Sequence, residues 1–267
     1  MKTPNPDCRL LPWDSAFFAK RIARITADVV GQGQMDEILA WCRSQKVDCL
    51  YYLCPTDDPG AIRMAEDRGF RLVDIRVELS ALLPGSQPTR QRTPAEHLVR
   101  PSTAEDMETL TALAGQAFRN TRFSNDPEFG PEAAPRLYQR WIKQDCESQT
   151  ATVLVSIADD RISGFISLEG ASGDTPSIGL IAVKDGMRGR GVGRALVEAS
   201  KDHCQRHGHS ELRVVTQVSN TAAVRLYEET GFRLSSVRLW YHKWFSLRPA
   251  DAESEARYEP TGAVLVK

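Results

Sequence analysis

The residues best suited to chemistry lie in two short stretches of the second half of the sequence. The first is a loop with alternating glycines, RGRGVG at positions 188–193, between an apolar run at 178–183 and a helical pattern. The first N–H groups of a helix have no internal partner and attract anions, and glycine lets a phosphate approach the backbone closely. Arg188, Arg190 and Arg194 add fixed positive charge. The loop therefore favours phosphate binding.

Other readings of this loop differ in how well they fit. A Walker loop ends in Gly-Lys-Ser/Thr, which is absent here, and a dinucleotide fingerprint needs G-x-G-x-x-G with an acid about 20 residues later. Here Gly189, Gly191 and Gly193 alternate instead, so the spacing of the glycines does not fit the fingerprint either. Alternating glycine and arginine also occur in plain solvated turns, so the loop by itself leaves both possibilities open.

The second stretch is N-x-A-A-x-x-x-Y-x-x-x-G-F, from Asn220 to Phe232. On a helix, Asn220 and Tyr227 are two turns apart and face the same side. Ala223 lies between them on that face and leaves room for a narrow ligand. Tyr227 could donate a proton to a leaving group, although a half-buried packing tyrosine is the plainer alternative.

The hydrophobic pattern predicts the elements that must position these residues. We expect helices over 35–44, 59–68, 103–117, the second part of 118–146, 192–206 and 220–230. We expect strands over 21–25, 49–54, 70–79, 152–157, 162–168, 178–183, 212–217 and 237–245, and irregular structure over 1–12. Alternating strands and helices of this kind predict an α/β (α+β) fold.

The first half of the chain resembles part of the second. Placing Gly69-Phe70 on Gly231-Phe232 aligns the surroundings without a gap, so that Arg76 falls on Arg238. The copies differ where chemistry needs particular residues, because Ala65 stands where the second copy has Tyr227. The first copy also lacks a glycine-rich loop. We interpret it as a degenerate repeat that helps to form the fold or the acceptor wall, although any strand–helix–strand unit would give some matches.

A segment rich in Pro, Ser, Gln and Arg predicts the domain organisation. We expect an N-terminal region over 1–83, a linker over 84–97, a catalytic domain over 98–247 and a polar tail over 248–267, with a last strand at 263–266.

Composition excludes several classes of protein. The net charge of −1 in 267 residues gives no basic excess for nucleic acid or anionic lipid. The N-terminal segment lacks an apolar leader, and no run reaches membrane-spanning length, so we expect a cytoplasmic protein. The cysteines contain no C-x-x-C pair and are expected to be reduced. His203, His207 and His209 are expected at a solvated helix end, with no metal.

With the loop and the second stretch together, the chain from Ser102 to Phe245 resembles the GNAT acetyltransferase superfamily, whose R-x-x-G-x-G loop binds the pyrophosphate of acetyl-CoA. The resemblance implies a GNAT fold with a mixed central sheet, preceded by the smaller degenerate GNAT-like half. It assigns contacts with acetyl-CoA to Ile181, Ala182, Val183, Arg188, Gly189, Arg190, Gly191, Val192, Gly193, Arg194, Asn220, Ala223 and Tyr227. It also assigns the oxyanion to backbone N–H groups near 180–183, and protonation of the thiolate to Tyr227.

Further segments resemble the dTDP-fucosamine acetyltransferases, a branch of that superfamily that acetylates the 4-amino group of a nucleotide-linked 4,6-dideoxy sugar. These segments are WDSAFF at 13–18, TRF at 121–123, YQRWI at 138–142 and LRVVTQ at 212–217. The acceptor implied is a small molecule, and a homodimer is possible. Arg122 is the candidate for acceptor binding, although a surface arginine in a loop is an equal alternative.

Several functional questions stay open at this point. The strand 177–183 carries no carboxylate that could accept the amine proton, so Glu169 on the preceding strand and a chain of waters are both candidates. A peptide N-terminus or a polyamine is an alternative acceptor. A non-catalytic acyl-CoA-binding module is an alternative of another class, which Tyr227 disfavours because a binding module needs no acid there.

Overall fold

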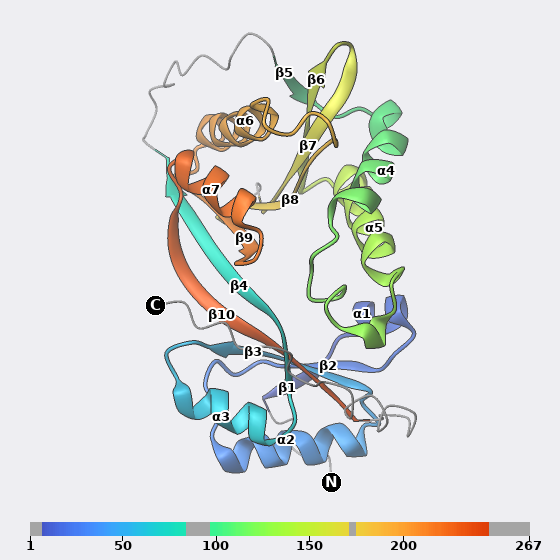
Figure 1. The fold of residues 1–267 in the computed structure, drawn as a ribbon, viewed down its shortest axis with the longest axis vertical. Helices are drawn as coiled ribbons and strands as arrows, with labels where there is room; N and C mark the ends of the chain where they lie inside the picture. The colour runs from blue at the N-terminus through green and yellow to red at the C-terminus, as the bar shows by residue number, and fades with distance from the viewer. Residues whose placement is uncertain (1–6, 84–96, 171–174, 246–267) are drawn as a thin grey trace, which may run out of the picture.

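One mixed sheet organises the computed structural model, which describes residues 7–83, 97–170 and 175–245. Its ten strands follow the order β1-β2-β3-β10-β4-β9-β8-β7-β6-β5 (Figure 1). The strands are β1 (Cys8–Leu10), β2 (Ile22–Ile25), β3 (Cys49–Pro55), β4 (Arg71–Leu82), β5 (Leu98–Pro101), β6 (Thr152–Ala158), β7 (Arg161–Glu169), β8 (Ser177–Val183), β9 (Glu211–Gln217) and β10 (Arg233–Trp244). The predicted mixed α/β fold is thereby confirmed.

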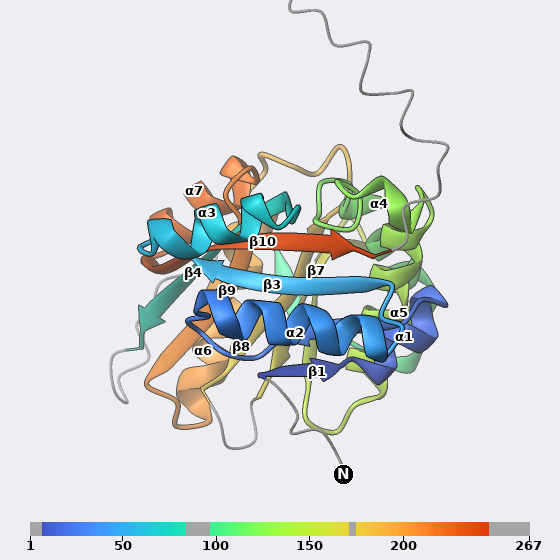
Figure 2. The same ribbon diagram turned by 90° about the horizontal axis from the view of Figure 1, so that it is seen from below.

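Helices cover both faces of this sheet. They are α1 (Pro12–Phe18), α2 (Gln32–Ser44), α3 (Pro59–Asp67), α4 (Met107–Ala117), α5 (Ala133–Glu147), α6 (Val192–Arg206) and α7 (Thr221–Glu229), with short 3₁₀ turns at Ala104–Asp106 and Pro127–Phe129. On β10, Leu239 and Tyr241 pack with α2 and α3, and Val237 packs with α6 and α7. Trp240 and Trp244 alternate with them and pack on the side of α1 and α5. Figure 2 shows α2 and α3 along β3 and β10.

Local sequence signals explain how several helices begin. The side chain of Asp58 accepts a hydrogen bond from the N–H of Ala61 at 2.9 Å, and Pro59 stands in the first turn of α3. Thr103 begins the turn before α4 in a capping box with Asp106. Each cap satisfies N–H groups that a helix terminus leaves without an internal partner.

Two predicted boundaries are wrong. The segment 1–12 is not irregular throughout, because β1 pairs antiparallel with β2 and α1 starts at Pro12. A three-residue edge strand is too short to show alternation in the sequence. The last strand begins at Arg233 and not at Val237, because its exposed first residues, such as Leu234, still form ladder pairs with β4. The predicted linker 84–97, apart from its last residue, and the tail with its strand at 263–266 lie outside the described residues.

The elements of the aligned segments coincide. Strands β3 and β9 each have seven residues, α3 and α7 nine, and β4 and β10 twelve, all in the gapless register of the alignment. The sheet does not keep the two segments apart, because β10 lies between β3 and β4 and pairs antiparallel with both. Figure 1 shows β4 and β10 running side by side along the molecule. That the first segment is a degenerate GNAT unit stays a prediction.

An opening between two central strands decides where a ligand can enter. Strands β8 and β9 are parallel, but their pairing covers Ser177 with Arg213 and Ile178 with Val214 and then ends. Immediately beyond, β8 has a bulge opposite β7, between the pairs Leu168–Ile178 and Ile166–Ile181. Because the bulge increases the local twist, β8 turns away from β9 at this point. The sheet is therefore open at this point, and groups on its two faces can reach the same ligand.

Candidate active site

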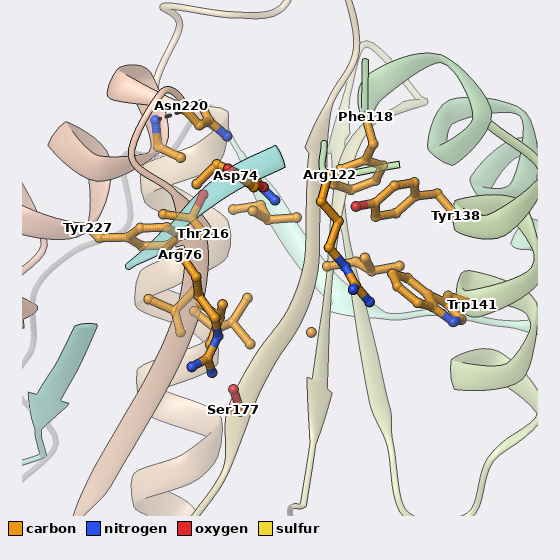
Figure 3. A pocket seen from close by; sticks show the side chains of 18 of the residues that line it. Asp74, Arg76, Phe118, Arg122, Tyr138, Trp141, Ser177, Thr216, Asn220 and Tyr227 are labelled. Atoms are coloured by element: carbon orange, nitrogen blue, oxygen red, sulfur yellow. Dashed lines mark hydrogen bonds between the residues drawn. The ribbon is translucent and has the colours of Figure 1, made fainter. Parts of the chain in front are cut away.

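A cavity of about 340 Å³ lies at the separation of β8 and β9. Its lining includes Gly179 and Ile181 of β8 and Thr216 of β9, together with side chains from both faces of the sheet. Figure 3 shows Asn220 and Tyr227 on one side, and Phe118, Arg122, Tyr138 and Trp141 on the other. A donor and an acceptor entering from opposite faces would therefore meet in this gap.

Tyr227 is held rigidly at the wall of the cavity. Its side chain is 2% exposed, and its ring packs against Phe232 with the ring centroids 5.5 Å apart. Burial raises the pKa of Tyr227 well above its ordinary value, so the phenol keeps its proton at neutral pH. A protonated hydroxyl that lines a cavity can act as a general acid.

Asn220 and Ala223 lie with Tyr227 on one side of α7, as predicted, and all three line the cavity. Asn220 is the N-cap residue of α7, and its side-chain oxygen accepts from the N–H of Ala223 at 3.3 Å. The carboxamide is therefore engaged with its own helix, and its N–H₂ group remains for a ligand.

The glycine-rich loop leads directly into α6. Gly191 is the N-cap residue of α6 with φ 87°, and it provides no side-chain cap for the first N–H groups of the helix. These groups therefore stay available for an anion. Arg188 and Arg190 are exposed, but Arg188 lies 3.0 Å from Asp185 in an ion pair. Positive φ at Gly189 as well explains the repeated glycine.

Contacts with α7 place this loop near the cavity. A side chain at Gly193 would meet Leu226 at 3.0 Å, so the start of α6 approaches α7 closely. Arg194 forms an ion pair with Glu229 of α7 at 2.7 Å, which ties the two helices together and occupies this guanidinium. Val192 is buried in the core beneath the loop. The loop residues themselves lie outside the lining of the cavity, unlike Ile181, Asn220, Ala223 and Tyr227.

Backbone groups of β8 face the gap. The N–H of Leu180 donates to Ser167 Oγ at 3.0 Å, and the N–H of Lys184 donates to Ser163, so both point to the β7 side. Alternate N–H groups of a strand point in opposite directions, and those of Ile181 and Val183 are therefore directed towards β9, where pairing has ended. Ala182 is buried with its side chain in the core on the α4 and α5 side. Of the N–H groups near 180–183 predicted to bind the oxyanion, that of Leu180 is therefore already engaged.

A pair of carboxylates lies on the opposite face from Tyr227. Glu169 ends β7 and lines the cavity, and a side chain at Gly179 would come within 2.6 Å of its Oε1. Burial raises the pKa of Glu169, and the charge of Asp145 raises it further. Asp145 Oδ2 is shielded from solvent and has no hydrogen-bond partner among the described residues. Glu169 is exposed to the cavity itself, so it is accessible to a ligand there.

Arg122 lies across the cavity from Tyr227, in an aromatic setting. Its guanidinium carbon is 4.5 Å from the ring centroid of Tyr51, 4.3 Å from that of Phe123 and 4.2 Å from that of Trp240. Nη1 is shielded from solvent and has no hydrogen-bond partner among the described residues. Arg122 is therefore not the plain surface arginine of the alternative interpretation.

The aromatic residues near Arg122 serve both the core and the cavity. Tyr138 is 7% exposed and stacks on Phe118 with the centroids 4.1 Å apart, and Trp141 packs edge-on against Tyr138. Burial raises the pKa of Tyr138 to about 12. These rings make one wall of the cavity rigid and largely apolar.

Sequence reasoning missed the residues that β4 and β10 bring to the cavity. Asp74, Arg76 and Trp240 all line it. Alternation in the sequence places Arg76 and Trp240 on strands. It cannot say that these strands, β4 and β10, run past the gap between β8 and β9. The alignment of Arg76 with Arg238 was the one signal that set this position apart.

No set of three or more His, Cys, Asp or Glu side chains in the described residues is arranged to hold a metal ion. Among the same residues, no helix is both long and apolar enough to cross a membrane.

Residues 115–232 match the model of the acetyltransferase (GNAT) family. The chain is 28% identical over 237 residues to a dTDP-fucosamine acetyltransferase of Escherichia coli O6:H1, an alignment that covers 87% of this chain and 96% of that protein. It is 26% identical over 218 residues to a mycothiol acetyltransferase of Clavibacter sepedonicus, with 80% and 68% covered.

Solved structures show the same fold. A GCN5-related N-acetyltransferase from Sphaerobacter thermophilus superposes with a TM-score of 0.62 at 18% identity, over 89% of this chain and 76% of that one. Three observations agree on the family: the glycine loop before α6, the separation of β8 from β9, and these likenesses to acetyltransferases. Residues 115–232 therefore form a domain of the GNAT family, and the protein is an N-acetyltransferase.

Proposed function

We propose that the protein transfers the acetyl group of acetyl-CoA to the primary amine of a nucleotide-linked amino sugar, such as a 4-amino-4,6-dideoxy sugar. The observation that supports this acceptor is the cavity at the β8–β9 gap, which joins Tyr227 on one face to Arg122 on the other. The likeness to the dTDP-fucosamine acetyltransferase over most of both chains points to the same class of acceptor.

In this proposal the glycine loop binds the pyrophosphate of acetyl-CoA. The free N–H groups at the start of α6 and the exposed Arg190 supply charge and donors for it. Asn220 and Ala223 border the path of the pantetheine arm between α7 and β8. The N–H groups of Ile181 and Val183, which face the gap, hold the thioester carbonyl and the oxyanion that develops from it.

The amine nitrogen attacks the carbonyl carbon and forms the new C–N bond. The C–S bond then breaks, so that the thiolate of coenzyme A departs and the acetyl group stays on nitrogen. Tyr227 gives its proton to the departing thiolate, and Glu169 accepts the proton that the amine loses. The two groups lie on opposite faces of the sheet, one on the donor side and one on the acceptor side. The surroundings suit each group to its role. Burial keeps Tyr227 protonated, and partial desolvation together with the charge of Asp145 makes Glu169 a stronger base than an ordinary carboxylate.

The acetylation of a mycothiol precursor is a second candidate, supported by the likeness to mycothiol acetyltransferases. The arginines beside the cavity disfavour a polyamine, since they would repel a polycation. A thiol-release assay with acetyl-CoA against nucleotide amino sugars, the mycothiol-type acceptor, peptides and polyamines tests the proposal. We expect the nucleotide amino sugars to give the highest kcat/KM. Preferred turnover of another acceptor would contradict the assignment.

A further inference from the structure

The acceptor face of the sheet is divided by charge. Glu169 lines the cavity at the β7 end, with the charge of Asp145 beside it. Arg24 and Arg122 lie at the other end, beside the ring of Trp240 of β10. This division applies to whatever molecule occupies the acceptor side, because an amine and an anion would be attracted to opposite ends.

Two arginines share the ring of Trp240. The guanidinium carbon of Arg122 lies 4.2 Å from the centroid of this ring and that of Arg24 lies 5.1 Å from it. Arg24 comes from β2, in the first half of the chain, and is half-buried. Two like charges beside one ring repel each other unless an anion lies between or next to them.

Most of the nearby acids are already engaged. Glu78 pairs with Arg76 at 3.1 Å, and Asp28 pairs with Arg238 at 2.7 Å. Neither Arg24 nor Arg122 forms an ion pair within 4.0 Å in the described part of the chain. The remaining acids that face these arginines are Asp14 and Asp74, and burial raises the pKa of both.

The pKa of Arg24 agrees with an excess of positive charge. Burial lowers it, and the neighbouring charges that lower it further are those of Arg122, Arg76, Arg9 and Arg238. A lowered pKa means that the charged form of Arg24 is disfavoured by its surroundings. An incoming anion would offset the repulsion among these arginines.

We propose that Arg24 and Arg122, together with Trp240, form a subsite for the diphosphate of the acceptor. The guanidinium groups fork onto phosphate oxygens, and their number suits a diphosphate better than a single carboxylate. The reactive amine then lies towards Glu169. This inference rests on the proposed function and adds that the first half of the chain, through Arg24 of β2, supplies part of the acceptor site.

A nucleoside diphosphate is the probe for this subsite. Because it could also bind the glycine loop, the enzyme is first saturated with coenzyme A, and the probe is titrated by calorimetry. We expect Arg24→Met and Arg122→Met to weaken binding roughly 10- to 100-fold, as for loss of a charge-assisted hydrogen bond, and Arg24→Lys to restore part of the affinity. Arg71→Met, an exposed arginine on the same strand as Arg76, is the matched control and should bind as the unaltered protein does.

A second measurement separates this subsite from the reaction itself. The preference for a phosphorylated amino sugar over its uncharged counterpart, as a ratio of kcat/KM, should fall 10- to 100-fold in Arg24→Met and stay in Arg71→Met. Failure of the probe to bind with coenzyme A present, or equal affinities in Arg24→Met and the control, overturns the subsite. In that case transfer to an uncharged amino sugar would leave the acetyltransferase proposal standing. Absence of transfer to every amine would instead contradict the proposed function.

Discussion

Arg76 of β4 and Arg238 of β10 stand directly opposite each other in the sheet, although they are far apart in the sequence. Like charges in this position destabilise a strand pair. Each arginine is therefore held by its own acid, Arg76 by Glu78 and Arg238 by Asp28. The pair marks the middle of the ladder through which the two halves of the chain depend on each other.

The first prediction concerns this dependence. Residues 1–97 by themselves should not fold stably, because β3 and β4 are not neighbours and are joined through β10. The fragment should show little dispersion in an amide NMR spectrum and no binding of coenzyme A. A fragment that unfolds cooperatively, with native-like chemical shifts, would show that the first half is an independent domain after all.

The second prediction concerns the proposed general acid. Tyr227→Phe should lower kcat by about 10²–10⁴-fold with little change in the apparent affinity for acetyl-CoA, because the ring and its packing stay while the proton donor is lost. The loss should be smaller if a step other than departure of the thiolate limits the rate. Steady-state kinetics measure it, with circular dichroism as the folding control. Full activity at every pH would make Tyr227 a packing residue.

The third prediction tests the glycine loop. Gly191→Val should weaken binding of coenzyme A, because a side chain would stand in the path of the pyrophosphate. Gly191 has φ 87°, so the substitution also strains the backbone. Gly208→Val is the matched control, since Gly208 has φ 84° and open space around it but lies beyond the far end of α6. Equal affinities of the two variants in calorimetric titration would remove the loop from the site.

The fourth prediction concerns Glu169 and its neighbour. Activity should fall as pH decreases through the raised pKa of Glu169, because only the ionised carboxylate accepts a proton. Asp145→Asn removes a like charge, so the acid limb of the profile of log kcat/KM against pH should move to lower pH. Glu169→Gln should lose activity about 10²–10⁴-fold and its acid limb with it. An unchanged acid limb in Glu169→Gln would assign the base to water.

The fifth prediction concerns a buried pair, Asp126 and His242, in which Asp126 belongs to the segment between α4 and α5 that also carries Arg122. His242 Nδ1 donates to Asp126 Oδ2 at 2.6 Å, and Trp244 donates to the same oxygen at 3.0 Å. Burial lowers the pKa of His242 to about 4 despite Asp126. Burial opposes the charge on Asp126, but the hydrogen bonds from His242 and Trp244 outweigh it and lower the pKa of Asp126.

Both His242 and Asp126 make the folded protein less stable as pH falls. Between pH 6.5 and 4 the unfolded chain protonates this histidine while the folded chain does not, so the free energy of unfolding decreases as pH falls. Asp126, with its depressed pKa, adds a loss at still lower pH. We expect His242 to contribute on the order of 2–3 kcal/mol to this decrease. His242→Gln can still donate to Asp126 but does not titrate there, so urea unfolding at pH 7 and 4.5 should show a smaller decrease. An equal decrease would contradict the assignment.

The sequence by itself determined the order of the elements apart from β1, α1 and β5, the gapless alignment of the first half with the second, and the two motifs that carry the GNAT likeness. These are local matters: alternation, helix caps such as Asp58, and glycines at positive φ depend on residues near in the chain. The positions of Tyr227 and Asn220 on one helix face followed from helical geometry alone. The contacts and chemical roles of these residues stay predictions.

Only the tertiary structure decided which distant segments share a site. Hydrophobic alternation does not say which strands pair, so the insertion of β10 between β3 and β4 could not be read from the residues. That pairing places the ring of Trp240 beside both Arg24 and Arg122, and it brings Arg76 to the lining of the same cavity. The separation of β8 from β9 likewise arises from a bulge opposite β7, and it places Glu169 and Tyr227 on opposite faces of one cavity.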